Sequence, residues 1–163
     1  MTSTLLVPVS ELIGTPGKQR SFSGEKVVSL RLGDTVVDGP MTVRGEVLGL
    51  IDAVTAHFTA SGEAHLTCTR CLKEWDATVT IEGDQVYQRV PDEDGYGIVG
   101  GEIDVSGPAQ DELALGLPLV PLCTPDCKGL CPTCGTDLNT EPCDGHGEDP
   151  DSPFTVLKDL FDF

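Results

Sequence analysis

The sequence CTPDCKGLCPTCGTDLNTEPCDGH occupies residues 123–146 and contains five cysteines and one histidine. Its central LCPTCG is a C-x-x-C-G turn, in which two thiolates can bind one metal ion from a loop too short to build a core. A second pair, Cys68 and Cys71, lies upstream in the chain. Because zinc takes four sulfur or nitrogen ligands, this pattern predicts loops stabilised by metal.

The composition indicates an acidic chain of ordinary domain size. It has 163 residues, of which 39% are hydrophobic, enough to bury a core without a metal. Ten Lys and Arg against 27 Asp and Glu give a formal net charge of −17. Such a surface repels phosphate backbones and attracts basic partners. We therefore expect a metal to order the cysteine segments locally.

The expected cellular location is inferred from the N-terminal sequence and from the lengths of the apolar segments. MTSTLLVPVSELIG has no basic region followed by a long apolar run, and no segment reaches the roughly 18 apolar residues that span a bilayer. We expect a cytoplasmic protein with no membrane partner. In that reducing compartment, closely spaced cysteines are more often metal ligands or redox groups than disulfides.

Between residues 41 and 90 the sequence alternates with a period of two. Apolar residues within 54–60, 64–68 and 75–81 alternate with polar ones, which is typical of half-buried antiparallel strands. Short connections predict hairpins, one of them with residues 68–73 at its tip. The expected fold class is α+β: an antiparallel β-meander or partial barrel with one or two short helices and a zinc-knuckle C-terminal segment.

We expect four parts along the chain. Residues 1–40 are strands and a loop, the loop over residues 14–24, packed on the core or flexible beside it. Residues 41–122 form the β-rich core, with a helix near 108–117 whose apolar stripe is Ala109, Leu113 and Leu117. Residues 123–146 form the zinc-binding knuckle segment. Residues 147–163 are an acidic linker and a short C-terminal helix that begins at Ser152.

Seven cysteines and one histidine supply eight donors, enough for two tetrahedral ions. In the favoured partition one ion binds Cys68, Cys71, Cys123 and Cys127. The other ion binds Cys131, Cys134, Cys143 and His146. The alternative is a single ion on Cys127, Cys131, Cys134 and Cys143, with the remaining thiols free. His57 and His65 alternate with apolar strand residues, so we expect both to face solvent and not to bind metal.

No catalytic arrangement accompanies these donors. A catalytic zinc keeps one coordination position open and has a base nearby, whereas protein ligands can close each site here. The sequence has no H-E-x-x-H, H-x-E…P-C-x-x-C or G-x-S-x-G motif and no phosphate-binding glycine loop. We expect structural zinc in a protein that is not an enzyme.

Four segments, in this order and at these separations, resemble the bacterial YceD family. They are CTRCLKEW (68–75), DELALGLPLVPLC (111–123), DCKGLCPTCGTDLN (126–139) and SPFTVLKDL (152–160). The resemblance covers roughly residues 40–163. It implies a role in accumulation of the large-subunit ribosomal RNA, 23S in bacteria, and hence in ribosome biogenesis, without enzymatic activity.

The resemblance also concerns the number of metal sites. Some family members lack the LCPTCG segment yet keep the first C-x-x-C, with His or Cys near the positions of Cys123 and Cys127. This implies two separate sites. The sequence departs from the family where other members have C-D-C, since it reads CDGH over residues 143–146.

Two mechanisms agree with such a role. The net charge favours holding a basic ribosomal protein, or binding a large-subunit assembly intermediate, over contacting RNA. Direct binding to 23S rRNA would use the basic residues beside the thiolates, Arg70, Lys73 and Lys128. The alternative function, unrelated to RNA, is a zinc-dependent redox-sensing or protein-interaction module whose thiols release the metal on oxidation.

Overall fold

The computed structural model describes residues 5–91, 93 and 95–146 of the chain. The C-terminal helix expected from Ser152 onward lies outside these described residues, as does the segment SPFTVLKDL. Among the residues that the structure describes, no helix is long and apolar enough to cross a membrane.

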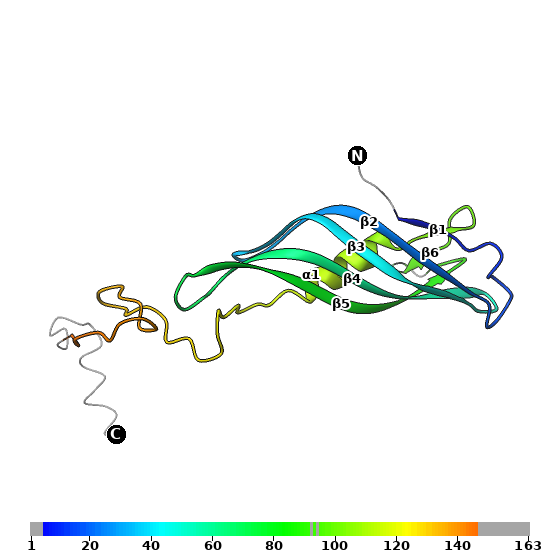
Figure 1. Cartoon of the computed structure of the whole chain (residues 1–163). Helices are drawn as coiled ribbons and strands as arrows, with labels where there is room; N and C mark the ends of the chain where they lie inside the picture. Colours follow the sequence, from blue (N-terminus) through cyan, green and yellow to red (C-terminus); the bar gives the residue numbers. More distant parts are fainter. Residues whose placement is uncertain (1–4, 92, 94, 147–163) are drawn as a thin grey trace, which may run out of the picture.

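A five-stranded sheet forms most of the fold (Figure 1). Its strands are β2 (Gln19–Leu32), β3 (Thr35–Gly49), β4 (Ala53–Thr67), β5 (Glu74–Gln88) and β6 (Tyr96–Gly97). They lie in the sheet in sequence order, with β2 at one edge and β6 at the other. Strands β2 to β5 pair antiparallel, and β6 runs parallel to β5. The predicted antiparallel meander is therefore confirmed.

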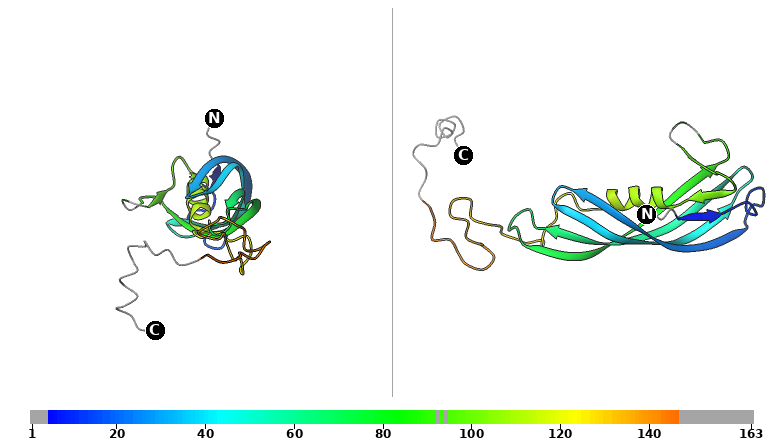
Figure 2. Two further views of the ribbon diagram at one scale, coloured as in Figure 1. Left: turned by 90° about the vertical axis from the view of Figure 1, so that its left-hand side faces the viewer. Right: turned by 90° about the horizontal axis from the view of Figure 1, so that it is seen from above.

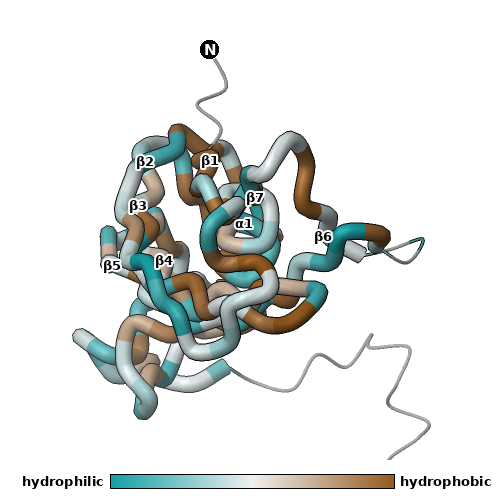
Figure 3. The backbone as a smooth tube through the Cα atoms, turned by 90° about the vertical axis from the view of Figure 1, so that its right-hand side faces the viewer, coloured by the Kyte–Doolittle hydropathy of each residue, from teal (hydrophilic) through white to brown (hydrophobic). Residues whose placement is uncertain are grey.

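The sheet curls around helix α1 (Ser106–Leu115), as the end-on view in Figure 2 shows. Burial alternates along the strands, so that in β4 the side chains of Val54, Ala56 and Phe58 are buried. Figure 3 shows apolar and polar positions interleaved along the backbone. This alternation is typical of a sheet with one face on a core and one in water. The α+β class with a partial barrel is confirmed.

Helix α1 lies inside the curl (Figure 2), and its buried side chains belong to the same apolar core as those of the strands. Ala109, Leu113 and Leu117 are all buried, as their helical spacing predicts. Gly62 in β4 allows the close approach, because a Cβ at that position would lie 3.3 Å from Leu113 Cδ2. The helix therefore fills the concave side of the sheet and completes the core.

A second, two-stranded sheet holds the N-terminal segment in place. Strand β1 (Leu6–Pro8) pairs antiparallel with β7 (Glu102–Asp104), the strand that leads directly into α1. Val7 and Ile103 are buried in the same core as the helix. The start of the described chain is thus packed on the core.

The region before residue 40 differs from our expectation in one respect. Residues 14–24 were expected to form a loop, but β2 begins at Gln19 and runs without a break to Leu32. Its first half contains serines and Gly24 in place of a strong apolar alternation, so the local strand signal is weak. Pairing with β3 outweighs that weak preference. Strand β3 itself runs through residue 40, where the first expected part ends.

The β4–β5 hairpin and the segment after α1 meet at one end of the molecule (Figure 1). Residues 68–73 form the hairpin tip, as the sequence predicts. The Thr69 backbone N–H donates to the Pro121 carbonyl at 3.0 Å. This contact brings the chain back to the hairpin tip just before Cys123.

Replacing Leu113 by alanine should lower the free energy of unfolding by about 2–5 kcal/mol, because its side chain is fully buried between α1 and the sheet. Leu115→Ala is the matched control. The same change at a helix side chain that is 80% exposed should alter that free energy by less than about 0.5 kcal/mol. Chemical denaturation followed by circular dichroism measures both. Equal losses in the two variants would contradict the position of α1.

Candidate metal centres

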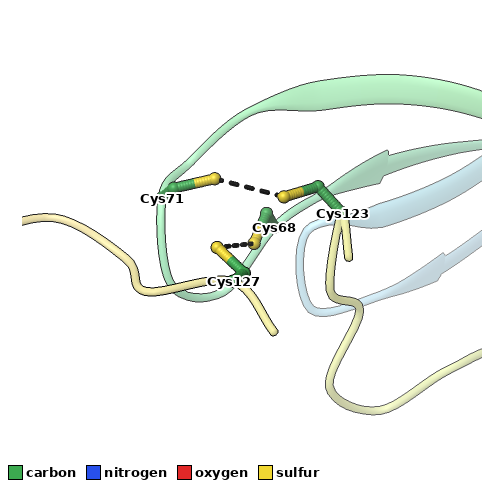
Figure 4. A group of neighbouring side chains, drawn as sticks. All are labelled: Cys68, Cys71, Cys123 and Cys127. Atoms are coloured by element: carbon green, nitrogen blue, oxygen red, sulfur yellow. Dashed lines mark hydrogen bonds between the residues drawn. The ribbon is translucent and has the colours of Figure 1, made fainter. Parts of the chain in front are cut away.

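Four cysteines from two distant segments point toward one another at the hairpin tip (Figure 4). Cys68 and Cys71 come from the turn between β4 and β5, and Cys123 and Cys127 from the segment after α1. The Sγ atoms of Cys68 and Cys127 are 3.8 Å apart, and those of Cys71 and Cys123 are 3.5 Å apart. All four sulfur atoms lie within 4.8 Å of one another. We call these residues the first thiol group.

Four further donors come together between Cys131 and His146. The Sγ of Cys143 lies 3.7 Å from that of Cys131, 3.9 Å from that of Cys134 and 3.0 Å from Nε2 of His146. These donor atoms also lie within 4.8 Å of one another. Cys131 is buried, whereas Cys134 and His146 are exposed. We call these four residues the second donor group.

The spacing in both groups fits a tetrahedral metal ion. Sulfur ligands at the usual Zn–S length of about 2.3 Å lie about 3.8 Å apart. A disulfide requires about 2.05 Å between sulfur atoms, and all seven cysteines are free. Thiolate and imidazole donors select zinc or a similarly soft ion over magnesium or calcium. The residues present could thus hold zinc, and its binding there stays a prediction.

The two groups have the same members as the two-ion partition. Cys127 is the residue that separates the two partitions, because the single-ion alternative assigns it to the later cysteines. In the structure its buried thiol lies against Cys68. A single ion on Cys127 and the later cysteines would therefore require the first thiol group to come apart.

His57 and His65 lie outside both groups. Each is exposed on the solvent side of the sheet and contacts a carboxylate of β5, Asp84 for His57 and Asp76 for His65. The hydrogen bond that His65 Nδ1 donates to the Asp76 carboxylate raises the pKa of His65 above its ordinary value. Both histidines thus face solvent, as the strand alternation predicts.

The two C-x-x-C turns share one backbone geometry. In the hairpin turn the Leu72 N–H donates to the Cys68 carbonyl at 3.0 Å, and in the later turn the Gly135 N–H donates to the Cys131 carbonyl at 2.9 Å. The residue after the second cysteine has a positive φ in both turns, 60° at Leu72 and 75° at Gly135. Glycine adopts that conformation freely, whereas leucine does so at a cost of about 1–2 kcal/mol. One type of turn therefore presents both pairs of thiols.

Hydrogen-bond donors around the thiols favour ionisation. Burial opposes ionisation of Cys68 most strongly, but backbone N–H groups, that of Cys123 first, lower the pKa of its thiol to about 6. The hydroxyl and backbone N–H of Thr136 lower the pKa of Cys134 to about 6, with a further contribution from His146. The pKa of Cys131 is lowered as well, by the backbone N–H groups of Cys134 and Thr133. Since the thiolate is the form that binds metal, each group contains at least one sulfur whose pKa is lowered toward neutral pH.

Arg70, in the hairpin tip, forms hydrogen bonds with the segment that contains Cys127 and Leu130. Its Nη1 donates to the Cys127 carbonyl at 2.7 Å, and its own carbonyl accepts the Leu130 N–H at 3.1 Å. Gly129 permits this approach, because a Cβ there would lie 3.0 Å from the Arg70 carbonyl oxygen. The guanidinium that the sequence suggests for RNA contact is thus engaged within the chain. Lys73 and Lys128, the other two candidates, are exposed.

Asn139 is a residue of the site that the sequence reasoning missed. Its Nδ2 donates to the Cys127 Sγ at 3.4 Å and to the Asp137 carboxylate at 2.7 Å. Its Oδ1 accepts the Lys128 backbone N–H at 2.8 Å. The only sequence signal is Asp137 and Asn139 together in a short loop, a pattern typical of side chains that bond their own backbone.

The chain matches the family model described as "Large ribosomal RNA subunit accumulation protein YceD" over residues 56–161. An uncharacterized protein of Mycobacterium tuberculosis is 36% identical over 94 residues, which are 53% of this chain and 44% of that protein. An uncharacterized protein of Mycobacterium leprae is 35% identical over 95 residues, 53% of this chain and 43% of that protein. The chain thus spans less than half the length of these relatives.

A plant relative has a more informative name. The "Large ribosomal RNA subunit accumulation protein YCED homolog 1, chloroplastic" of Zea mays is 51% identical over 39 residues, 24% of this chain and 13% of that protein. No solved structure matches the chain. The family model covers the β4–β5 hairpin, α1 and both groups of donors, which is well over half of the sequence. The chain therefore belongs to the YceD family of large ribosomal RNA subunit accumulation proteins.

Proposed function

We propose that the chain is a non-enzymatic ribosome-biogenesis factor that promotes accumulation of 23S rRNA and of the large ribosomal subunit. The observation that carries the proposal is the match of residues 56–161 to the YceD family model. The printed name of the maize relative supports it. The proposed place of action is the cytoplasm, without involvement of a membrane.

Two zinc ions have a structural role in this proposal. Each set of four protein donors would fill a tetrahedral shell and would leave no position for a substrate. Bound zinc supplies a cross-link between segments that are far apart in the sequence. The proposed ligands of the first ion are Cys68, Cys71, Cys123 and Cys127. Those of the second are Cys131, Cys134, Cys143 and His146.

The solvent side of strands β3, β4 and β5 supports a basic protein as the partner. Arg44 is the only Lys or Arg in β3, β4 and β5. Glu46 and Asp84 flank His57 on the neighbouring strands, and Glu82 is exposed on the same face. Such a surface attracts a Lys- and Arg-rich protein and repels RNA phosphates. We therefore favour a basic ribosomal protein, or an assembly intermediate that displays one.

Direct contact with 23S rRNA is the second candidate mechanism. Lys73 and Lys128 favour it, because both are exposed beside the first thiol group. Phosphate contacts of this kind weaken steeply as salt rises, which separates them from contacts to a protein. The redox-sensing alternative, unrelated to RNA, rests on the same free thiols and requires zinc release on treatment with peroxide.

Elemental analysis of the purified chain by mass spectrometry should find about two zinc ions per chain, because two complete donor sets are present. Cys131→Ser combined with Cys134→Ser should leave about one ion. Circular dichroism should show an unchanged sheet in that variant, since the apolar core lies in the strands and α1. One ion or none in the unsubstituted chain would contradict two structural sites.

Deletion of the gene should lower the ratio of 23S to 16S rRNA in the cell, and the full-length chain should restore it. A chain with Cys68→Ser and Cys71→Ser should fail to do so, because the hairpin tip loses the thiols that face residues 123–127. Leu115→Ala, at an exposed helix position, should restore the ratio fully. Quantitative RNA electrophoresis measures the ratio, and an unchanged ratio after deletion would overturn the proposed role.

Affinity capture at about 50 mM salt, with the full chain as bait, should recover Lys- and Arg-rich ribosomal proteins that remain bound after nuclease treatment. A bait with Glu82→Gln and Asp84→Asn should recover less of them. Recovery of 23S rRNA fragments that are lost at about 200 mM salt would select the direct RNA contact instead. Recovery of acidic or neutral proteins alone would contradict the basic partner.

A further inference from the structure

We propose that Asn139 couples the two candidate metal centres, so that metal binding by the second donor group strengthens metal binding by the first thiol group. The inference rests on the two zinc ions of the proposed function. It goes beyond that function because it makes the two centres interdependent and names the residue that connects them.

The side chain of Asn139 reaches from one centre to the other. By sequence it belongs to the loop between Cys134 and Cys143, two members of the second donor group. Its amide nevertheless donates to the sulfur of Cys127 at 3.4 Å, and its oxygen accepts the Lys128 N–H at 2.8 Å. A hydrogen bond to a ligating thiolate stabilises the charged sulfur and fixes its orientation. Asn139 is thus an outer-shell partner of the first thiol group.

The loop that carries Asn139 is held against the segment that follows Cys127. The Leu138 N–H donates to the Gly129 carbonyl at 3.0 Å, and Leu130 forms an isolated β-bridge with Asp137. Asp137 in turn accepts both the backbone N–H and the side-chain amide of Asn139, at 3.0 and 2.7 Å. These contacts place the Asn139 amide beside Cys127. The placement depends on residues 137–139 keeping this conformation.

Closure of the second donor group restricts this conformation further than these contacts do by themselves. Asn139 is exposed, so its hydrogen bond to Cys127 competes with water unless the loop is ordered. A metal that joins Cys134 to Cys143 narrows the range of conformations open to the loop between them. The loop then loses less conformational entropy when the Asn139 amide bonds the Cys127 sulfur. By linkage, a loaded first thiol group favours loading of the second by the same factor.

The test measures how tightly the first thiol group binds Co²⁺ in the full chain, in competition with a chelator. Cobalt held by four thiolates absorbs differently from cobalt held by three thiolates and an imidazole, so the two centres are followed separately. Asn139→Leu should weaken binding by the first group about 10-fold or more, the low end of the range for outer-shell partners. Asn139→Asp, which keeps the acceptor for Lys128 but loses the donor to Cys127, should weaken it as well.

Thr140→Val is the matched control within the same loop. Within the part of the chain that the structure describes, its hydroxyl bonds the Asp137 carbonyl at 3.0 Å and forms no hydrogen bond with the first thiol group. This change should leave the Co²⁺ affinity of that group within about twofold. An equal loss in Thr140→Val and Asn139→Leu would mean that loop order alone is responsible, and it would overturn the role assigned to the amide.

A double-mutant cycle tests the coupling itself. Cys131→Ser with Cys134→Ser removes the second centre and should weaken the first group about as much as Asn139→Leu does. Combined with Asn139→Leu, it should cause little further loss, because both changes act through the same contact between Asn139 and Cys127. Losses that multiply, or no loss in either variant, would overturn the coupling. Circular dichroism verifies that each variant keeps its sheet.

The outcomes also separate this inference from the proposed function. An unsubstituted chain that binds fewer than two metal ions contradicts the proposed structural zinc and removes the basis of the coupling. A chain that binds two ions, with affinities that Asn139→Leu leaves unchanged, overturns the coupling alone.

Discussion

The meeting of two thiol pairs at one end of the sheet fixes the path of the chain beyond the helix. Cys68 and Cys127 are 59 positions apart, yet their sulfur atoms are neighbours. In the chain-entropy model, a cross-link that closes a loop of roughly this length stabilises the folded state by about 4 kcal/mol. The hydrogen bonds of Arg70 to Cys127 and Leu130 fix the orientation of this segment against the hairpin tip. Without the contact between the two thiol pairs, little would hold residues 123–146 beside the hairpin.

The remainder of the structure has a different source of stability. Strands β2 to β5 and helix α1 share an apolar core that contains every large buried aliphatic side chain of the described residues. Residues 123–146 contribute only Cys127 and Cys131 to the buried apolar set. A segment that buries so little cannot fold through the hydrophobic effect alone, so thiols and short hydrogen bonds determine its shape. Loss of the contacts between the thiols and loss of core packing are therefore distinct events in this protein.

The sequence predicts those elements whose burial has a regular period. Alternation predicted β4 and β5, and the stripe that includes Leu113 predicted α1, because one face of each element is buried. The number of donors favoured two sets of four, whereas their spacing along the chain left the single-ion alternative open. Strand β2 was missed because its pairing with β3 decides its structure. Asn139 was missed because Cys127, 12 positions away, becomes its neighbour only through the pairing of Leu138 with Gly129.

The position of β2 at the edge of the sheet has a consequence for self-association. No described strand pairs with the outer side of this 14-residue edge strand, so its backbone groups are available to an extended chain that approaches. In this acidic protein, three of the ten basic residues lie on that strand: Arg20, Lys26 and Arg31. Arg20 and Lys26 are half-buried and bond the Pro8 carbonyl and the Ser106 hydroxyl, whereas Arg31 is exposed. The positive charge of the strand still disfavours edge-to-edge pairing of two copies. The same edge does not repel an acidic strand. Its charge therefore disfavours pairing with a second copy of this chain more than pairing with an acidic partner.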